Sequence, residues 1–159
     1  MKKNIPAHKS VKILLIAFSH FIHDVYTSFL SPILPILMER FALSYTSLAF
    51  LRVILRIPSL LNPFIGSLTD RTDLKYFVAL TPAITGTAMC LMGNMPDYLS
   101  LVLLLFIAGI SSCFFHVPAP SLLKNISDKK LGMSMSAFQI GGELSRSVGP
   151  VVVVAAISL

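Results

Sequence analysis

Five long apolar segments alternate with short polar connections along this chain of 159 residues. Each segment is long enough to cross a lipid bilayer, because a spanning helix needs about 20 mostly apolar residues. Backbone amides inside a bilayer must be hydrogen-bonded within the segment itself, and the segments lack the alternating polarity of barrel strands, so all five are predicted to be helices. The predicted helices cover approximately residues 11–38, 47–68, 75–95, 98–123 and 132–159.

The composition points to the same class of protein. Hydrophobic residues make up 55% of the chain and charged residues only 13%, whereas a soluble domain carries about 25% charged residues. An ordinary soluble enzyme and a disordered tail are therefore excluded. The net charge of +6 does not indicate a nucleic-acid-binding module, because the basic residues form no continuous patch. We predict an all-α membrane protein with a single transmembrane domain over residues 1–159, surrounded by lipid and without a cofactor.

The basic residues outside the apolar segments are distributed unevenly between the two sides of the membrane. Nine of them lie in the amino-terminal tail and in the second and fourth connections, whereas only Arg40 lies in the first or third. Because cytoplasmic connections carry an excess of Lys and Arg, the amino terminus is predicted to be cytoplasmic. The nine residues are Lys2, Lys3, Lys9, Lys12, Arg71, Lys75, Lys124, Lys129 and Lys130.

The last apolar segment runs to Leu159 with no aromatic or basic residue after it. Spanning helices usually have such interfacial anchors at both ends. We therefore expect this chain to be a piece of a longer protein.

Four of the five segments contain ionisable residues, and the third contains none between Tyr76 and Pro96. A charged side chain at the centre of a bilayer costs about 2.5–3.5 kcal/mol on insertion scales, so each one calls for an explanation. Helical spacing places these residues on one face of each helix, which predicts four walls around a wet cavity and a third helix that faces lipid. The residues are His20, His23, Asp24, Arg52, Arg56, His116, Glu143 and Arg146.

The depths of these residues, counted at 1.5 Å per residue, leave several ion pairs open. Asp24 can pair with Arg56, and Glu143 can pair with either Arg52 or Arg146. His20 and His116 are both expected about 12 Å from the cytoplasmic face. One interpretation is that the charges neutralise one another and lock the bundle.

The other interpretation is a site for a small anion. Three arginines outnumber two carboxylates in the segments, and a guanidinium binds carboxylate or phosphate oxygens through two parallel hydrogen bonds. The predicted substrate-binding residues are Arg52, Arg56, Arg146, His116 and Gln139. The predicted proton-coupling residues are Asp24, Glu143 and His20.

The run from His20 to Asp24 also admits a metal site. No Glu follows the first His, as it does in the helix of zinc proteases. We therefore expect no metal here. A proton relay formed by Asp24 and His20 is favoured over a metal site, and simple helix-packing polarity remains the alternative to the relay.

Several motifs resemble the major facilitator superfamily of transporters. Gly66, Asp70 and Arg71 match its loop signature, in which a Gly and three further residues precede Asp-Arg, although Asp73 stands where a second Gly is usual. The resemblance implies that these three residues form a conformational latch. Other stretches are similar to the fosmidomycin-resistance-type branch, namely His20–Asp24 with Leu34-Pro35, Phe115–Pro118, Phe138–Glu143 and Ser147–Pro150. The paired glycines that follow the Gly-Pro of antiporters are replaced by Val153 and Val154.

The resemblance implies an alternating-access carrier, in which two six-helix halves rock about a site near the midplane. The five segments then correspond to most of one half, and the missing carboxy-terminal helices are an expected partner. The leading hypothesis is a proton-coupled secondary transporter of a small anion, such as a phosphonate or an organic acid, in a bacterial inner membrane. The alternative is a truncated or structural membrane fragment without transport activity. An intramembrane enzyme built on His20, His23 and His116 is disfavoured, because the only thiols, Cys90 and Cys113, lack nearby partners in sequence.

Overall fold

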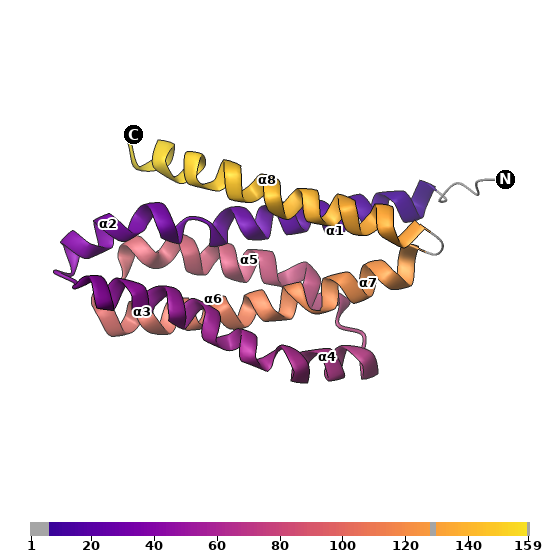
Figure 1. Cartoon of the computed structure of the whole chain (residues 1–159), viewed down its shortest axis with the longest axis horizontal. Coiled ribbons are helices and arrows are strands. Elements are labelled where there is room, and N and C mark those ends of the chain that lie inside the picture. The colour runs from indigo at the N-terminus through magenta and orange to yellow at the C-terminus, as the bar shows by residue number, and fades with distance from the viewer. Residues whose placement is uncertain (1–6, 128–129, 159) are drawn as a thin grey trace.

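The computed structural model describes residues 7–127 and 130–158, and it is helical in nearly all of this part of the chain. Five stretches are long and apolar enough to cross a membrane, and they agree with the predicted segments to within a few residues. The prediction of an all-α membrane fold is therefore confirmed. Figure 1 shows the stretches side by side, with the start of the first and the end of the last at opposite ends of the bundle. They are His8–Arg40, Tyr45–Arg71, Lys75–Asn94, Tyr98–Ser127 and Leu131–Ile157.

Three of the five spans are broken near their middle, which the sequence analysis did not anticipate. The first consists of α1 (Ala7–Thr27) and α2 (Leu30–Arg40), and the fourth consists of α6 (Tyr98–His116) and α7 (Pro118–Ser127). In the second span, the 3-10 turn η1 (Ile57–Leu61) joins α3 (Tyr45–Arg56) to α4 (Asn62–Arg71).

Proline accounts for each break. Pro32, Pro58 and Pro118 stand at or just after the three interruptions. A proline lacks the backbone N–H of the helix ladder, and its ring clashes with the carbonyl four residues earlier. The remaining spans are α5 (Lys75–Leu91), which ends in the 3-10 turn η2 (Met92–Asn94), and α8 (Leu131–Ile157).

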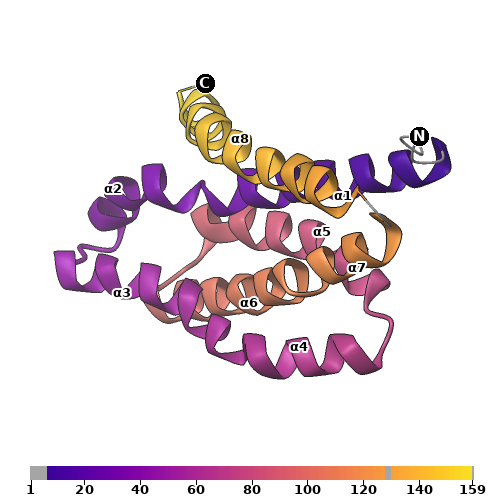
Figure 2. The same cartoon turned by 45° about the vertical axis from the view of Figure 1, so that its right-hand side comes forward.

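The helices approach one another closely at glycine positions. α1 packs against α8 and α5, and α6 packs against α5 and α3. A Cβ atom added at Gly141 of α8 would lie 2.5 Å from the carbonyl oxygen of Ala17, and one added at Gly109 of α6 would lie 2.5 Å from that of Leu55. Small residues let spanning helices come this close, where van der Waals contact stabilises the bundle. Figure 2 shows α8 and α4 at opposite edges of the molecule, with α1, α5 and α6 between them.

The third span only partly fits the expectation that it faces lipid. One face of α5 exposes large apolar side chains such as Tyr76 and Leu80. Its other face packs against both α1 and α6 and buries the hydroxyls of Thr81 and Thr85. The third helix therefore belongs partly to the interior.

The basic residues gather at one end of the bundle. In Figure 1 the starts of α1 and α8 and the ends of α4 and α7 lie together, and these ends carry Lys12, Arg71, Lys124 and Lys130. At the other end, Arg40 donates hydrogen bonds to the carbonyl oxygens of Gly93 and Met95. Lys2, Lys3 and Lys129 lie outside the described residues.

Candidate functional site

A buried cluster forms around the carboxylate of Asp24, and we call His20, His23, Asp24 and His116 the imidazole cluster. Asp24 Oδ2 lies 3.3 Å from His20 Nε2, and Asp24 Oδ1 lies 2.9 Å from His23 Nδ1 and 3.2 Å from His116 Nε2. α1 supplies the first three residues, and the last residue of α6 supplies the fourth. The side chain of His116 is 37% exposed, whereas those of the other three are nearly inaccessible. His20 and His116, which were expected at the same depth, have ring centres 5.2 Å apart.

Aromatic rings hold two of the imidazoles in place. The His20 ring stacks on Phe138 of α8, with ring centres 3.9 Å apart, and its Nδ1 lies 2.7 Å from the Phe138 carbonyl oxygen. The His23 ring stacks on Phe115 of α6, with ring centres 4.6 Å apart. Packing and hydrogen bonds together therefore fix the direction in which each ring nitrogen points.

A chain of hydroxyl groups continues from the imidazole cluster into the third span. Thr85 Oγ1 lies 3.2 Å from His23 Nε2 and donates to Ser111 Oγ at 2.9 Å, and Ser111 donates to the Thr81 carbonyl oxygen at 3.1 Å. These residues were not predicted from the sequence, because their side chains carry no charge. The available signal was the four-residue spacing of Thr81 and Thr85, which places both hydroxyls on one face of a mostly apolar helix.

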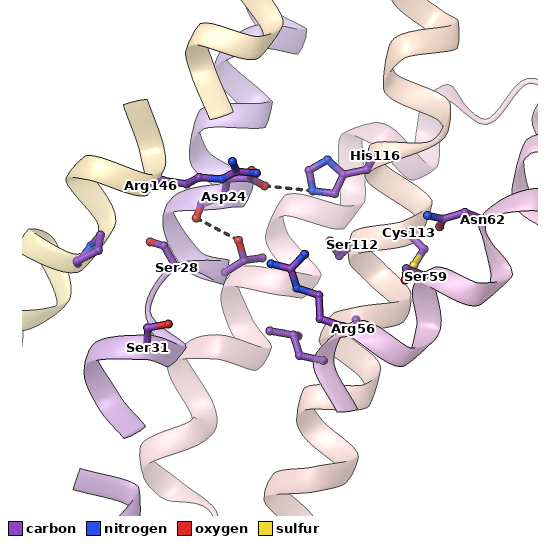
Figure 3. Close-up of a pocket in the computed structure, with 14 residues that line it drawn as sticks. Asp24, Ser28, Ser31, Arg56, Ser59, Asn62, Ser112, Cys113, His116 and Arg146 are labelled. Carbon is purple, nitrogen blue, oxygen red and sulfur yellow. Dashed lines mark hydrogen bonds and ion pairs between the residues drawn. The ribbon is translucent and has the colours of Figure 1, made fainter. Parts of the chain in front are cut away.

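Beside the imidazole cluster lies a cavity of about 480 Å³, which Asp24 and His116 both line. Figure 3 shows Arg56 pointing from α3 into the space between α1 and α6, and Arg146 extends into the same cavity from α8. All three helix breaks reach this cavity, through Ser28, Ser59 and His116. The other lining residues are Thr27, Ser31, Leu55, Asn62, Gly109, Ser112, Cys113 and Pro150.

The cavity collects only some of the predicted substrate-binding residues. Arg56, Arg146 and His116 line it. Arg52 instead lines a neighbouring, more open hollow, which it shares with Arg56. Gln139 is exposed on α8 and lines neither space.

The ion pairs differ from the expected ones at Asp24. Within the described part of the chain, Asp24 has three histidine partners and forms no ion pair with Arg56. Glu143 pairs with Arg146 at 2.9 Å, one of the two options left open, and both side chains are more than half exposed. Glu143 is therefore separate from the buried cluster.

The predicted latch residues lie at the end of the bundle that carries the basic residues. Gly66, Asp70 and Arg71 belong to α4. The side chains of Asp70 and Arg71 are exposed, and within residues 7–127 and 130–158 neither forms a hydrogen bond or an ion pair. A Cβ atom at Gly66 would meet Val117 at 3.9 Å, an ordinary contact, so close packing in this structure does not require glycine there.

Next to these residues, the connection to α5 is closed by a local ion pair. Lys75 Nζ donates to Asp73 Oδ2 at 2.7 Å. This hydrogen bond, with a second from the Lys75 backbone N–H, holds the pKa of Asp73 below its usual range. Asp73 stands where the family usually has a second Gly. In this chain the carboxylate at that position is paired with Lys75.

The spacing of the imidazole cluster alone would admit a metal ion. The ligand atoms of His20, Asp24 and His116 lie within 4.8 Å of one another. We assign no metal to them, because two arginines line the same cavity and their positive charges oppose a cation there.

The Major Facilitator Superfamily model matches residues 16–159 of this chain. The chain belongs to the major facilitator superfamily. It is 25% identical over 136 residues to the fosmidomycin resistance protein of Escherichia coli (strain K12), a match that covers 85% of this chain. It is 23% identical over 143 residues to the uncharacterized MFS-type transporter YfnC of Bacillus subtilis (strain 168), covering 88% of this chain.

The chain spans about a third of the length of these two relatives, since each match covers 34% of the relative. No solved structure matches the chain significantly. Family membership and the five apolar spans indicate a multi-pass integral membrane protein in contact with lipid.

Proposed function

We propose that this chain forms part of a proton-coupled secondary transporter for a small anion. The observation that carries the proposal is the cavity in which Arg56 and Arg146 face a buried carboxylate shared by three imidazoles. The two guanidinium groups come from different spans, so an anion between them would connect α3 to α8. Sites in secondary transporters lie between two halves that rock about them, so the missing half would complete this site from the other side.

The residues of the cavity and of the imidazole cluster divide into two roles. Arg56 and Arg146 bind the anion through their forked N–H groups, with His116 at the rim as a third donor. Asp24 and His20 carry the coupled protons, because they are buried, ionisable and in contact. Glu143 contributes indirectly, since its carboxylate partly neutralises Arg146.

The three interrupted helices support the same assignment. Non-helical backbone at membrane depth is tolerated where it is buried in protein or lines a water-filled cavity. Substrate sites in secondary transporters are typically formed by such discontinuous helices. Here the breaks after Thr27, at η1 and after His116 all reach one cavity.

The partners and location follow from the same proposal. The ligand is an anion such as a phosphonate or an organic acid, and one relative is named for resistance to fosmidomycin. Further helices of the same carrier would close the cavity, and Gly66, Asp70 and Arg71 would contact them as a latch. We place the protein in a bacterial inner membrane with a cytoplasmic amino terminus, which the basic end of the bundle supports.

The experiment compares two arginines that lie four residues apart in α3. Uptake of methylphosphonate is measured in cells that express the complete reading frame encoding this chain. Arg56→Gln is expected to reduce uptake by at least tenfold, whereas Arg52→Gln, outside the cavity, is expected to leave more than half of it. Equal uptake by the wild type and Arg56→Gln, or an equal loss in both variants, would refute this role of the cavity.

A further inference from the structure

The hydrogen-bond directions around His20 fix the position of one proton. His20 Nδ1 lies 2.7 Å from the Phe138 carbonyl oxygen. A carbonyl oxygen only accepts, so Nδ1 must carry the hydrogen. In a neutral imidazole the other nitrogen, Nε2, then has a lone pair, and this lone pair faces Asp24 Oδ2 at 3.3 Å. Two lone pairs repel, and a proton between them turns the contact into a hydrogen bond.

The hydroxyl chain fixes the proton of His23 in the same way. Ser111 must donate to the Thr81 carbonyl oxygen, so Ser111 Oγ accepts from Thr85, and Thr85 has no hydrogen left for His23. His23 Nε2 is therefore the donor to Thr85 at 3.2 Å. Its Nδ1, 2.9 Å from Asp24 Oδ1, has a lone pair whenever His23 is neutral.

His116 behaves differently from the other two histidines. Only its Nε2 is directed at Asp24. A neutral His116 with its hydrogen on Nε2 makes this contact without an extra proton. Thus two of the three contacts to Asp24, and not the third, each require a proton beyond those of neutral imidazoles and a carboxylate.

We propose that the imidazole cluster takes up two protons together with the anion, with Thr85 as the positioning residue that commits His23 to this role. This inference rests on the proposed anion transport and adds the number and the positions of the coupled protons. The protons come from water in the cavity and return to water when the anion leaves. Loading changes the net charge of the imidazole cluster from −1 to +1.

The surroundings explain why the loading depends on the anion. Apart from Asp24 and His116, the titratable and charged groups that line the cavity are Arg56 from α3, Arg146 from α8 and Cys113 from α6. The α5 side chain bonded to the imidazole cluster is the hydroxyl of Thr85. A doubly protonated cluster beside two guanidinium groups is strongly positive, so a bound anion stabilises it. By linkage, protonation strengthens anion binding by the same factor.

The π faces of Phe138 and Phe115 also support the loaded form. Each ring stacks on one of the two imidazoles that would carry an added proton. The face of an aromatic ring is negative, so it favours a cationic partner.

The number of protons also indicates the charge of the substrate. A doubly charged anion would cross together with two protons without net movement of charge, so a dianion is the favoured substrate class.

The test reads the imidazole nitrogens directly by ¹⁵N NMR of histidine-labelled, complete protein. The signals of His20, His23 and His116 are assigned from the one that disappears when each is replaced by Gln in turn. At low pH, His20 and His23 are expected to be imidazolium. As the pH rises, His20 should become the Nδ1–H tautomer and His23 the Nε2–H tautomer. The opposite tautomers, or neutral His20 and His23 throughout pH 5–9, would overturn the proposal.

Variants of α5 test the role of Thr85. Thr85→Val should leave His23 as a mixture of tautomers, whereas Thr85→Ser, which keeps the hydroxyl, and Thr87→Val, at an exposed position of the same helix, should match the wild type. An unchanged His23 tautomer in Thr85→Val would contradict this role.

A zinc titration tests the alternative of a metal site. If Zn²⁺ at micromolar concentration shifts the His20 and His116 signals and lowering the pH does not, the imidazole cluster is a metal site and the proposal is wrong.

The NMR result separates this inference from the proposed function. If NMR finds the predicted tautomers but the cells do not take up methylphosphonate, the proposed transport is refuted and the proton positions stand. Normal uptake with the wrong tautomers would refute the two-proton inference and leave the proposed transport standing.

Discussion

At the scale of single residues, the side chains with the clearest roles are those with several partners. Asp24 shares two oxygens among three imidazoles, and its side chain is 7% exposed. Removing one partner from a buried charged network leaves the others unsatisfied, which is costly. Glu143 and Arg146 form an isolated pair with 69% and 65% of their side chains exposed, so that pair contributes little to stability.

Asp97 allows a residue-scale prediction outside the membrane. Its Oδ1 accepts from the Ser100 backbone N–H at 2.8 Å, and this hydrogen bond to the first turn of α6 holds the pKa of Asp97 below its usual range. Because the pKa is depressed in the folded state, the stabilisation is present above the unfolded-state pKa of about 4 and is lost as the pH falls through the folded-state value.

Asp97→Ala should therefore lower the melting temperature at pH 7, and the difference from the wild type should shrink below about pH 4. Asp97→Asn keeps a good cap and should remain close to the wild type at pH 7. The measurement is thermal unfolding of the complete protein in detergent. A constant difference between Asp97→Ala and the wild type from pH 7 to pH 3 would contradict this account.

Most of the charged residues of the site could be found from the sequence because a charge in a membrane is expensive. This reasoning identified Asp24, His20, His116, Arg56 and Arg146, all of which lie at the imidazole cluster or the cavity. It could not find Thr85, since a threonine satisfies its hydroxyl within its own helix in many spanning segments.

Arg52 was assigned to the same site as Arg56 from their four-residue spacing. They do share a face, along the open hollow. Arg56, however, is the last residue of α3, where the chain turns into η1, and only it reaches the cavity. A straight helix was assumed, so this difference was not visible from the spacing.

At the scale of helices, prolines and glycines shape the site. The prolines interrupt three spans at the level of the cavity, whereas the glycines bring α8 onto α1 and α6 onto α3. The number and approximate ends of the spans follow from apolar length alone. The positions of the breaks could not be predicted in the same way, because many prolines in spanning helices are accommodated without a break, as Pro82 in α5 and Pro150 in α8 are.

A pair of glycines in α8 gives the prediction at this scale. A Cβ atom at Gly149 would lie 2.8 Å from the Val25 carbonyl oxygen and would collide with the Ser28 side chain, whereas one at Gly132 meets nothing within 4 Å. Gly149→Ala should therefore lower the free energy of unfolding by about 1–3 kcal/mol.

Gly132→Ala is the matched control and should be neutral or stabilising by up to about 1 kcal/mol, because alanine favours the helix. Both are measured by denaturant titration of the complete protein in detergent. Equal stability of the two variants would show that α1 and α8 do not pack as closely as described.

At the scale of the whole molecule, the distribution of charge gives the bundle two different ends. One end of the bundle carries the lysines and arginines of four helix ends. At the other end, Arg40 donates to the carbonyl oxygens of Gly93 in η2 and of Met95 directly after it. The membrane orientation should follow from this asymmetry.

Single-cysteine labelling tests the orientation after Cys90→Ser and Cys113→Ser have removed the native thiols. Asn94→Cys, at the end with few basic residues, should react with a membrane-impermeant maleimide in intact cells. Thr72→Cys, in the connection between α4 and α5, should react only after the membrane is permeabilised. The reverse pattern would place the amino terminus outside.

The account as a whole depends on an anion and protons sharing one cavity, and the most direct measurement is proton flux driven by an anion gradient. Vesicles containing the product of the complete reading frame are given an inward methylphosphonate gradient, and internal pH is recorded with a fluorescent dye. We expect internal acidification with the wild type and its loss with either Asp24→Asn or Arg56→Gln, whereas Arg52→Gln retains it. Methylphosphonate entry without any change of internal pH, or unchanged acidification in Asp24→Asn, would contradict the account.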